Sequence, residues 1–390
     1  MTKRGVLLAA CLATTALAGL LSSASAATTD ILIGLDNKIT WGPNGSVPVA
    51  PGPDAVLVMD ISNPVKPRIR ASLPLMNSLT GPPTNLGITP DGRVGLVANS
   101  MLHVPDGPAW KQVPDDKLHV IDLAANPPKL AEVVTVGKQP SGLAISRKGD
   151  LALIANRDGK SVTVLSIQGT AVKVVSEVKT DVPAAAVAIS PDGKRAFVCF
   201  NTVNKVGVLA IDGQTVTYDK AMDLPVAFAP YNVDFAPDGK YVFVSNVGAQ
   251  NGNNDAIVTI EATGPHPHVI DLMSPGSGAE GFAVAPNGKT AATPLLSGTG
   301  AKPSDWFFTK TSELVLMSVG PKGKLTVTAR SQLGRLPEGI AYSADSQYIY
   351  VGNYLDSDLQ IFHINNGKLQ EITPKVKLPG QPASIRAPVR

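Results

Sequence analysis

Short apolar stretches alternate with turns along most of the chain, and the same arrangement returns after roughly 50 residues. Each unit contains an apolar stretch, a Pro-Asp-Gly-type turn, a second apolar stretch and, in most copies, a terminal Asn. Pro presets φ early in a turn and Gly accepts positive φ later, so each unit predicts a two-stranded hairpin. The hairpins are expected at 84–99, 140–156, 183–201, 230–246, 280–294 and 337–353.

A third strand follows each hairpin, with the alternation typical of a sheet that packs one face on a neighbour. Seven such strands accompany only six complete hairpins, and the missing hairpin is divided between 382–385 and 31–35. The pattern predicts an all-β fold, a seven-bladed β-propeller whose ring is closed by pairing N- and C-terminal strands in one blade. The third strands are expected to begin at Leu57, Leu118, Val162, Val206, Ile257, Leu314 and Leu359.

The first residues have the pattern of an export signal. Lys3 and Arg4 precede an apolar run over 5–21, and small residues over 24–26 favour cleavage near Ala26. No later segment has the roughly 18 apolar residues of a membrane helix, so no membrane anchor is expected. The prediction is a signal peptide over 1–26, a single propeller domain over 27–390, and a periplasmic or secreted location.

The formal charge of the whole chain is +3, and no cluster of Lys and Arg stands out. Nucleic-acid binding depends largely on such clusters, so the composition argues against a nucleic-acid partner. Beyond the signal the only cysteine is Cys199, which lies in an apolar strand. It is expected to be a small core residue, with a catalytic thiol as the alternative.

Long insertions mark one face of the predicted ring. They fall between second and third strands at 36–54, 100–117, 247–255 and 297–312, which places them together on the face called the upper face below. Trp41, Trp110 and Trp306 all lie in these insertions. They are candidates for ligand-binding aromatic residues at a pocket mouth, or each Trp pins its own loop to the blade below.

The first strands begin, and the second strands end, around the upper mouth of the central channel. Polar residues at these positions are candidates for ligand binding. A repeated Asn at a strand end also serves to cap turn backbone or to tie blades together, and both alternatives stay open. The candidates are Asn85, Asn99, Asn156, Asn201, Tyr231, Asn232, Asn246 and Asn353.

Glu280 and Glu338 depart from the repeat, because the same position in the other blades holds Asn, Ser, Ala or Tyr. A carboxylate at a channel mouth can act as a general base, or it can be solvated or paired with Arg157. His103, in an upper insertion, is a further candidate base. The catalytic candidates are therefore Glu280, Glu338, His103 and Arg157. The only histidine pair with a suitable spacing, His266 and His268, is a weak metal signal, and no metal site is predicted.

The repeated units at 139–145, 190–194 and 348–353 give the chain a resemblance to YVTN-repeat, YncE-like and lactonase-like propeller proteins. The resemblance extends over nearly all of the chain beyond the signal. It implies the propeller fold and a range of activities that includes lactone hydrolysis, lactone formation and binding without chemistry. In its enzymes a His, Glu and Arg set works on one face, and His103, Glu280 or Glu338, and Arg157 are the residues able to play these parts.

The chain also resembles calcium-dependent gluconolactonase-type propellers, which implies Ca²⁺ at Glu280 and Glu338 as an alternative to the absence of any cofactor. Two functions are predicted as alternatives. The first is an exported module that binds a small molecule or a periplasmic protein on the upper face. The second is a lactone hydrolase that uses the Glu, His and Arg side chains at the channel mouth.

Overall fold

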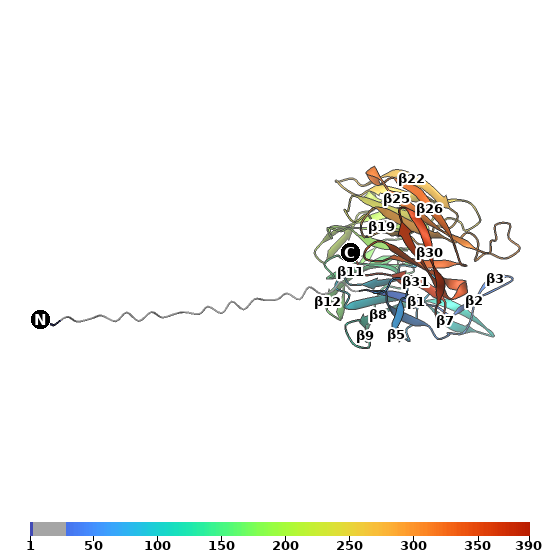
Figure 1. The fold of residues 1–390 in the computed structure, drawn as a ribbon, viewed down its shortest axis with the longest axis horizontal. Helices are drawn as coiled ribbons and strands as arrows, with labels where there is room; N and C mark the ends of the chain where they lie inside the picture. Colours follow the sequence, from blue (N-terminus) through green and yellow to red (C-terminus); the bar gives the residue numbers. More distant parts are fainter. Residues whose placement is uncertain (3–28) are drawn as a thin grey trace.

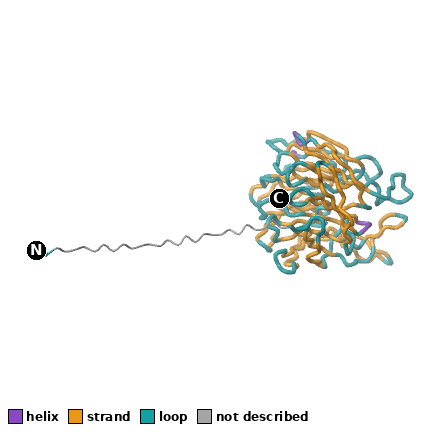
Figure 2. The backbone as a smooth tube through the Cα atoms, in the orientation of Figure 1, coloured by secondary structure: helices purple, strands orange, loops and turns teal. Residues whose placement is uncertain are grey.

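The computed structural model describes residues 1–2 and 29–390. In these residues seven blades of four antiparallel strands form a ring (Figures 1 and 2), so the predicted all-β seven-bladed β-propeller is confirmed. The predicted signal peptide falls almost wholly on residues outside the described part. Within the described residues no helix is long and apolar enough to cross a membrane. In the part of the chain that the structure describes, the helices are three 3-10 turns, η1 (Lys220–Met222), η2 (Pro321–Gly323) and η3 (Tyr354–Asp356).

The ring closes as the repeat predicts. Strand β31 (Pro382–Arg386) pairs antiparallel with β1 (Asp30–Leu35), and Ile33 faces Ile385. Strand β1 then pairs with β4 (Ala55–Asp60), which pairs with β5 (Arg68–Leu73). One blade thus takes its innermost strand from the end of the chain, which leaves no open edge between first and last blades.

The other blades follow in chain order, each with its innermost strand first. Their strands are β6 (Leu86–Ile88), β7 (Val94–Asp106), β8 (Ala109–Asp122), β9 (Lys129–Thr135); β10 (Pro140–Ile145), β11 (Leu151–Asn156), β12 (Ser161–Gln168), β13 (Ala171–Lys179); β14 (Val187–Ile189), β15 (Arg195–Phe200), β16 (Lys205–Asp212), β17 (Thr215–Tyr218) with β18 (Leu224–Pro225) beside β16; β19 (Pro230–Phe235), β20 (Tyr241–Asn246), β21 (Asp255–Glu261), β22 (His268–Gly276); β23 (Ala283–Val284), β24 (Thr290–Leu295), β25 (Ser312–Val319), β26 (Leu325–Leu333); β27 (Pro337–Tyr342), β28 (Tyr348–Asn353), β29 (Asp358–Asn365), β30 (Lys368–Lys377).

The core is divided into layers between neighbouring blades, because each strand turns apolar side chains to both faces of its sheet. The layer between the closing blade and the last blade contains Leu57, Tyr350 and Ile385, all fully buried. Cys199 lies in another layer and is fully buried and free, as a core residue. Burial raises the pKa of its thiol, which keeps the thiol protonated and argues against the catalytic alternative.

The two faces differ as the insertions indicate. The upper face carries a separate hairpin, β2 (Ile39–Gly42) and β3 (Gly45–Pro48), and the paired extension of β7 and β8, in which Asp106 faces Ala109. Figure 1 shows β2, β3 and the end of β7 projecting on the same side of the molecule. The tight turns between first and second strands lie at the opposite, lower face. The channel between them therefore has two chemically distinct mouths.

Candidate functional site

The upper mouth is lined by the residues at the start of each first strand. Glu280 precedes β23 and Glu338 lies in β27, in adjacent blades of the ring. Both side chains are buried, with exposed fractions of 6% and 3%. Tyr231 occupies the same position in β19, on the other side of Glu280. The two carboxyl groups that break the sequence repeat thus come together next to one aromatic side chain.

A backbone irregularity helps to aim Glu338. The register of β27 against β28 shifts between Glu338 and Ile340, and the residue between them, Gly339, has a φ of 76°. A Cβ on Gly339 would lie 2.4 Å from the backbone nitrogen of Ile385, so this close approach to β31 requires glycine. Such bulges redirect a side chain at the rim of a sheet. The Glu-Gly pair is therefore a structural unit.

The carboxyl groups sit in an environment that favours their protonated forms. Burial raises the pKa of Glu280 to about 8, although the nearby charge of Arg157 acts in the opposite direction. The pKa of Glu338 lies well above its usual range, first because of burial and second because of the charge of Glu280. Among the described residues Glu338 Oε2 is buried and has no hydrogen-bond partner. Near neutral pH the two carboxyl groups therefore favour their protonated forms. One of their oxygen atoms has no hydrogen-bond partner among the described residues.

Arg157 follows β11 and reaches the same mouth. Its backbone N–H donates to Gln139 O, as the N–H of Tyr354 donates to Leu336 O in the last blade, so the two residues are equivalent in the ring. The guanidinium carbon of Arg157 lies 5.7 Å from the centroid of the Tyr231 ring, a cation–π distance. Arg157 therefore lies over the Tyr231 ring, and its charge acts on Glu280 of the carboxyl pair.

The asparagines of the mouth use their amide groups within the fold. Asn99 donates to Asp115 Oδ2 at 2.6 Å and Asn353 to Asp358 Oδ1 at 2.7 Å, each in its own blade. Asn85 donates to Asn77 Oδ1 at 2.6 Å, and Asn232 ties its blade to the next through Phe282 O at 3.1 Å. Asn156 and Asn246 also donate within their own blades. These bonds tie neighbouring strands and loops together. Six of the asparagines nevertheless have an Oδ1 that is buried without a partner among the described residues: Asn85, Asn99, Asn156, Asn201, Asn246 and Asn353.

His103 is engaged in the upper loops. Its Nδ1 lies 3.0 Å from Val49 O, and its Nε2 lies 3.1 Å from the amide nitrogen of Gln112. The ring is buried, with 5% exposed. Both ring nitrogens thus have partners in the loops, and His103 connects the insertion of the closing blade to the β7–β8 extension.

The three tryptophans differ in their surroundings. The Trp41 Nε1–H donates to Gly300 O at 3.0 Å, and its ring packs edge-on against Tyr354 with centroids 5.5 Å apart. Trp110 lies on the projecting β7–β8 extension opposite Pro105. Trp306 is 79% exposed. Of the three, Trp41 joins two insertions and lines the cavity described next.

A cavity of about 410 Å³ opens between the upper insertions, and we call it the upper cavity. Trp41, Lys302, Asp305 and Phe307 contribute to its walls, together with two leucines. These two, Leu296 and Leu336, also belong to an apolar cluster with Val247, Tyr354 and Ala383 around the mouth. Its volume lies in the range of small-molecule sites. Leu336 precedes Glu338 by two residues, so the cavity and the carboxyl pair are neighbours along the chain.

The gluconolactonase-type resemblance implies a calcium site among the oxygen-bearing side chains of the upper mouth. Within the described residues no group of three or more His, Cys, Asp or Glu side chains is placed to hold a metal ion. Calcium takes six to eight oxygen ligands, and besides Glu280 and Glu338 this mouth offers the amide oxygens of Asn201, Asn246 and Asn353, which are buried without a partner among the described residues. Ca²⁺ at this mouth stays a prediction, and no chemical step below runs through a metal.

Sequence reasoning missed one buried cluster beside this mouth. The Lys38 ammonium is fully buried, lies 2.9 Å from Asp36 Oδ1 and contacts Asp54 Oδ2. Burial raises the pKa of Asp54, against the effect of Lys38. The hydroxyl of Tyr354 donates to Asp36 O at 2.9 Å. The signal was present at the ends of the first insertion, where two Asp flank a Lys, and the cluster anchors that insertion to the mouth.

Comparison with known protein families and with characterised proteins by sequence finds no match. Comparison with solved structures finds many similar folds. A putative 6-phosphogluconolactonase of Bacteroides fragilis is 16% identical, with a TM-score of 0.67, over 92% of this chain and 97% of that one. The periplasmic gluconolactonase of Pseudomonas aeruginosa is 16% identical, with a TM-score of 0.67, over 92% and 98%.

The hydrazine synthase of Kuenenia stuttgartiensis is also similar, at 18% identity and a TM-score of 0.61, over 80% of this chain and 91% of that one. At such identities the likeness shows the fold alone, and these three proteins of similar fold have names that denote different activities. The chain has the lactonase-like seven-bladed β-propeller fold. The resemblance to YVTN-repeat and YncE-like proteins stays a prediction.

Proposed function

We propose that this protein hydrolyses a lactone at the upper mouth, with Glu280 and Glu338 as its acid–base pair. The observation that carries the proposal is the burial of Glu280 and Glu338 together, with Glu338 Oε2 unpartnered among the described residues and the charge of Arg157 acting on Glu280. Two structures of similar fold are named as lactonases, and this supports the choice of substrate class.

The electrostatics assign the two roles. Arg157 acts to lower the pKa of Glu280, so Glu280 is the first of the pair to ionise, and its charge then keeps Glu338 protonated. In the proposed reaction ionised Glu280 takes a proton from water as the water oxygen attacks the lactone carbonyl carbon. When the ring C–O bond breaks, the Glu338 carboxyl gives its proton to the departing alkoxide. Arg157 stabilises the negative charge that develops on the carbonyl oxygen.

The upper cavity is proposed to hold the part of the substrate that does not react. It is lined by Leu336, two residues before Glu338 in the sequence, and it combines Trp41 with the charged Lys302 and Asp305. An aromatic face and charged hydrogen-bonding groups together suit a hydroxylated ring. A sugar lactone is therefore preferred to an aliphatic one, and the export signal at 1–26 is the basis for proposing that the substrate is met outside the cytoplasm.

The test is turnover of sugar and aliphatic lactones in a lightly buffered pH-stat assay, with calcium and with chelator. The wild type is expected to hydrolyse a sugar lactone, and Glu280→Gln to lose roughly 100-fold or more of kcat/KM, the usual range for a general base. Glu132→Gln, an exposed Glu on β9, is the matched control and should keep full activity. Full activity of Glu280→Gln would overturn the assignment.

A binding module is the second candidate, favoured by the near-complete burial of both carboxyl groups. The same panel distinguishes it. Saturable quenching of Trp41 fluorescence by a lactone or its hydroxy acid, with no proton release, would replace hydrolysis by binding. The variant Trp41→Phe should then remove the quenching.

A further inference from the structure

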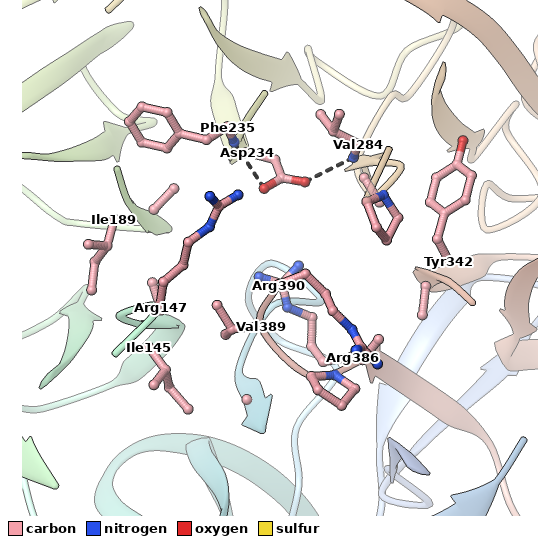
Figure 3. Close-up of a pocket in the computed structure, with 18 of the residues that line it drawn as sticks. Ile145, Arg147, Ile189, Asp234, Phe235, Val284, Tyr342, Arg386, Val389 and Arg390 are labelled. Carbon is pink, nitrogen blue, oxygen red and sulfur yellow. Dashed lines mark hydrogen bonds between the residues drawn. The ribbon is translucent and has the colours of Figure 1, made fainter. Parts of the chain in front are cut away.

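The channel has a second cavity at its lower mouth, on the face opposite the carboxyl pair. It has a volume of about 190 Å³ and is lined by the ends of the innermost strands and the turns that follow them. Figure 3 shows four charged side chains at this cavity, Arg147, Asp234, Arg386 and Arg390. A water molecule takes roughly 30 Å³ in the liquid, so the space suits one small molecule.

One ring of equivalent positions explains why the cavity exists. At the inward-facing position near the lower end of each first strand, five blades have glycine or alanine, which leave the channel open. The other two blades have Asp234 in β19 and Arg386 in β31, aligned with each other by their strands. The small residues, which all line the cavity, are Gly87, Ala144, Ala188, Ala283 and Ala341.

Arg147 is a third departure from the repeat. It opens the turn between β10 and β11 at a position where four other blades have proline, and three of these prolines also line the cavity: Pro191, Pro237 and Pro286. Its side chain is directed toward Asp234 in Figure 3. The turn itself does not need arginine, because proline meets the same backbone requirement in those blades. The side chain is therefore what distinguishes this blade.

The charges at the lower mouth do not cancel. The Asp234 carboxylate accepts hydrogen bonds from the N–H groups of Phe235 and Val284, each at 2.9 Å, so it is fixed between two blades (Figure 3). Within the described residues neither Arg147 nor Arg386 forms a direct ion pair with Asp234, and both guanidinium groups interact with its carboxylate at longer range. Two arginines therefore share one carboxylate whose hydrogen-bonding capacity is already partly used.

We infer that the lower cavity is a binding site for a small anion with a phosphate or carboxylate group, held by Arg147 and Arg386. Guanidinium groups present planar pairs of N–H donors that match these anions. Asp234 holds the two cations apart and leaves room for the ligand between them. The site is separate from the proposed hydrolytic centre, and it needs no activity of that centre.

The test is isothermal titration of the purified protein with inorganic phosphate and, separately, with succinate at low ionic strength. The wild type is expected to bind one or both, and Arg147→Pro and Arg386→Ala are each expected to weaken binding at least tenfold. Both variants introduce the residue that other blades have at that position, so the fold should persist. Thermal unfolding of each variant checks this, and Arg147→Pro alone decides the matter if Arg386→Ala does not fold.

Two control variants separate a built site from general charge. Lys148→Ala, an exposed cation in the same turn as Arg147, should leave affinity unchanged, and so should Glu280→Gln at the other mouth. Three results would overturn the inference: no binding of either probe to the wild type, unchanged affinity in Arg147→Pro, or an equal loss in Lys148→Ala.

Discussion

The two mouths of the channel lie at opposite ends of the same seven strands, and acidic and basic residues occur there in opposite proportions. At the upper mouth two carboxyl groups, Glu280 and Glu338, face one cation, Arg157. At the lower mouth the cations Arg147 and Arg386 face one carboxylate, Asp234. The repeat supplies the scaffold at both ends, and a few departures from it supply these charged groups.

Burial disfavours the charged forms of the ionisable groups at both mouths, with different results. It raises the pKa of Glu280 and Glu338 and so favours their neutral forms. At the lower mouth it lowers the pKa of Arg147 and Arg386, yet arginine stays charged because its ordinary pKa is so high. The upper mouth can therefore exchange protons near neutral pH, whereas the lower mouth keeps a permanent charge. Chemistry suits the first and anion binding suits the second.

The largest expected effect is on stability as a function of pH. Glu338 is protonated in the folded protein over a range where it is ionised in the unfolded chain, because its pKa is raised from an ordinary value of 4.5. Its contribution to stability is complete below about pH 4.5 and is lost as pH rises toward its folded pKa. Replacing it by Gln should reduce the fall in the free energy of unfolding between pH 5 and 9, by a few kcal/mol.

Urea unfolding at a series of pH values measures this, with Glu132→Gln as the exposed control. Curves for Glu338→Gln and the wild type that run parallel from pH 5 to 9 would contradict the raised pKa. No comparable pH dependence is expected when a lower-mouth arginine is replaced, and that difference sharpens the contrast between the mouths.

A smaller effect is expected on the pH profile of the proposed hydrolysis. The wild-type kcat/KM should rise with pH as Glu280 ionises near pH 8. Arg157→Met removes the charge that lowers this pKa, so the profile should move to higher pH by roughly one unit. Arg157→Lys keeps the charge and should keep the profile close to that of the wild type. A shift to lower pH in Arg157→Met would show that Arg157 does not act on Glu280.

The alternation of apolar residues and the Pro-Asp-Gly turns were sufficient to predict the ring, its split blade and its two faces. They also located Glu280 and Glu338, because a departure from a repeat is visible in the sequence. The same test, applied to the inward-facing position of each strand, would have found Asp234 and Arg386. The sequence alone does not decide which residues of a short strand face the channel. That register follows from the bulges at 230–232 and 338–340.

Other features depend on contacts that no local pattern encodes. Lys38 is buried because Asp36 and Asp54, at the two ends of an insertion, meet around it in space. Trp41 and Trp306 look alike in the sequence, yet one bonds to Gly300 across the face and the other is 79% exposed. Partners distant in sequence decided both outcomes, through packing of loops whose lengths alone were predictable.

The smallest expected effect tests whether Asp234 limits anion binding at the lower mouth. Asp234→Asn keeps the side-chain volume and removes the negative charge, so phosphate should bind roughly fivefold more tightly, an effect of about 1 kcal/mol. The Asn side chain can accept from only one of the two N–H groups of Phe235 and Val284 with its oxygen, so stability should fall by about 1 kcal/mol. Asp238→Asn, in the following exposed turn, is the control in the same titration. If Asp234→Asn weakens phosphate binding instead, then Asp234 orients the arginines, and the two mouths resemble each other more closely, with one charge at each held in place by its opposite.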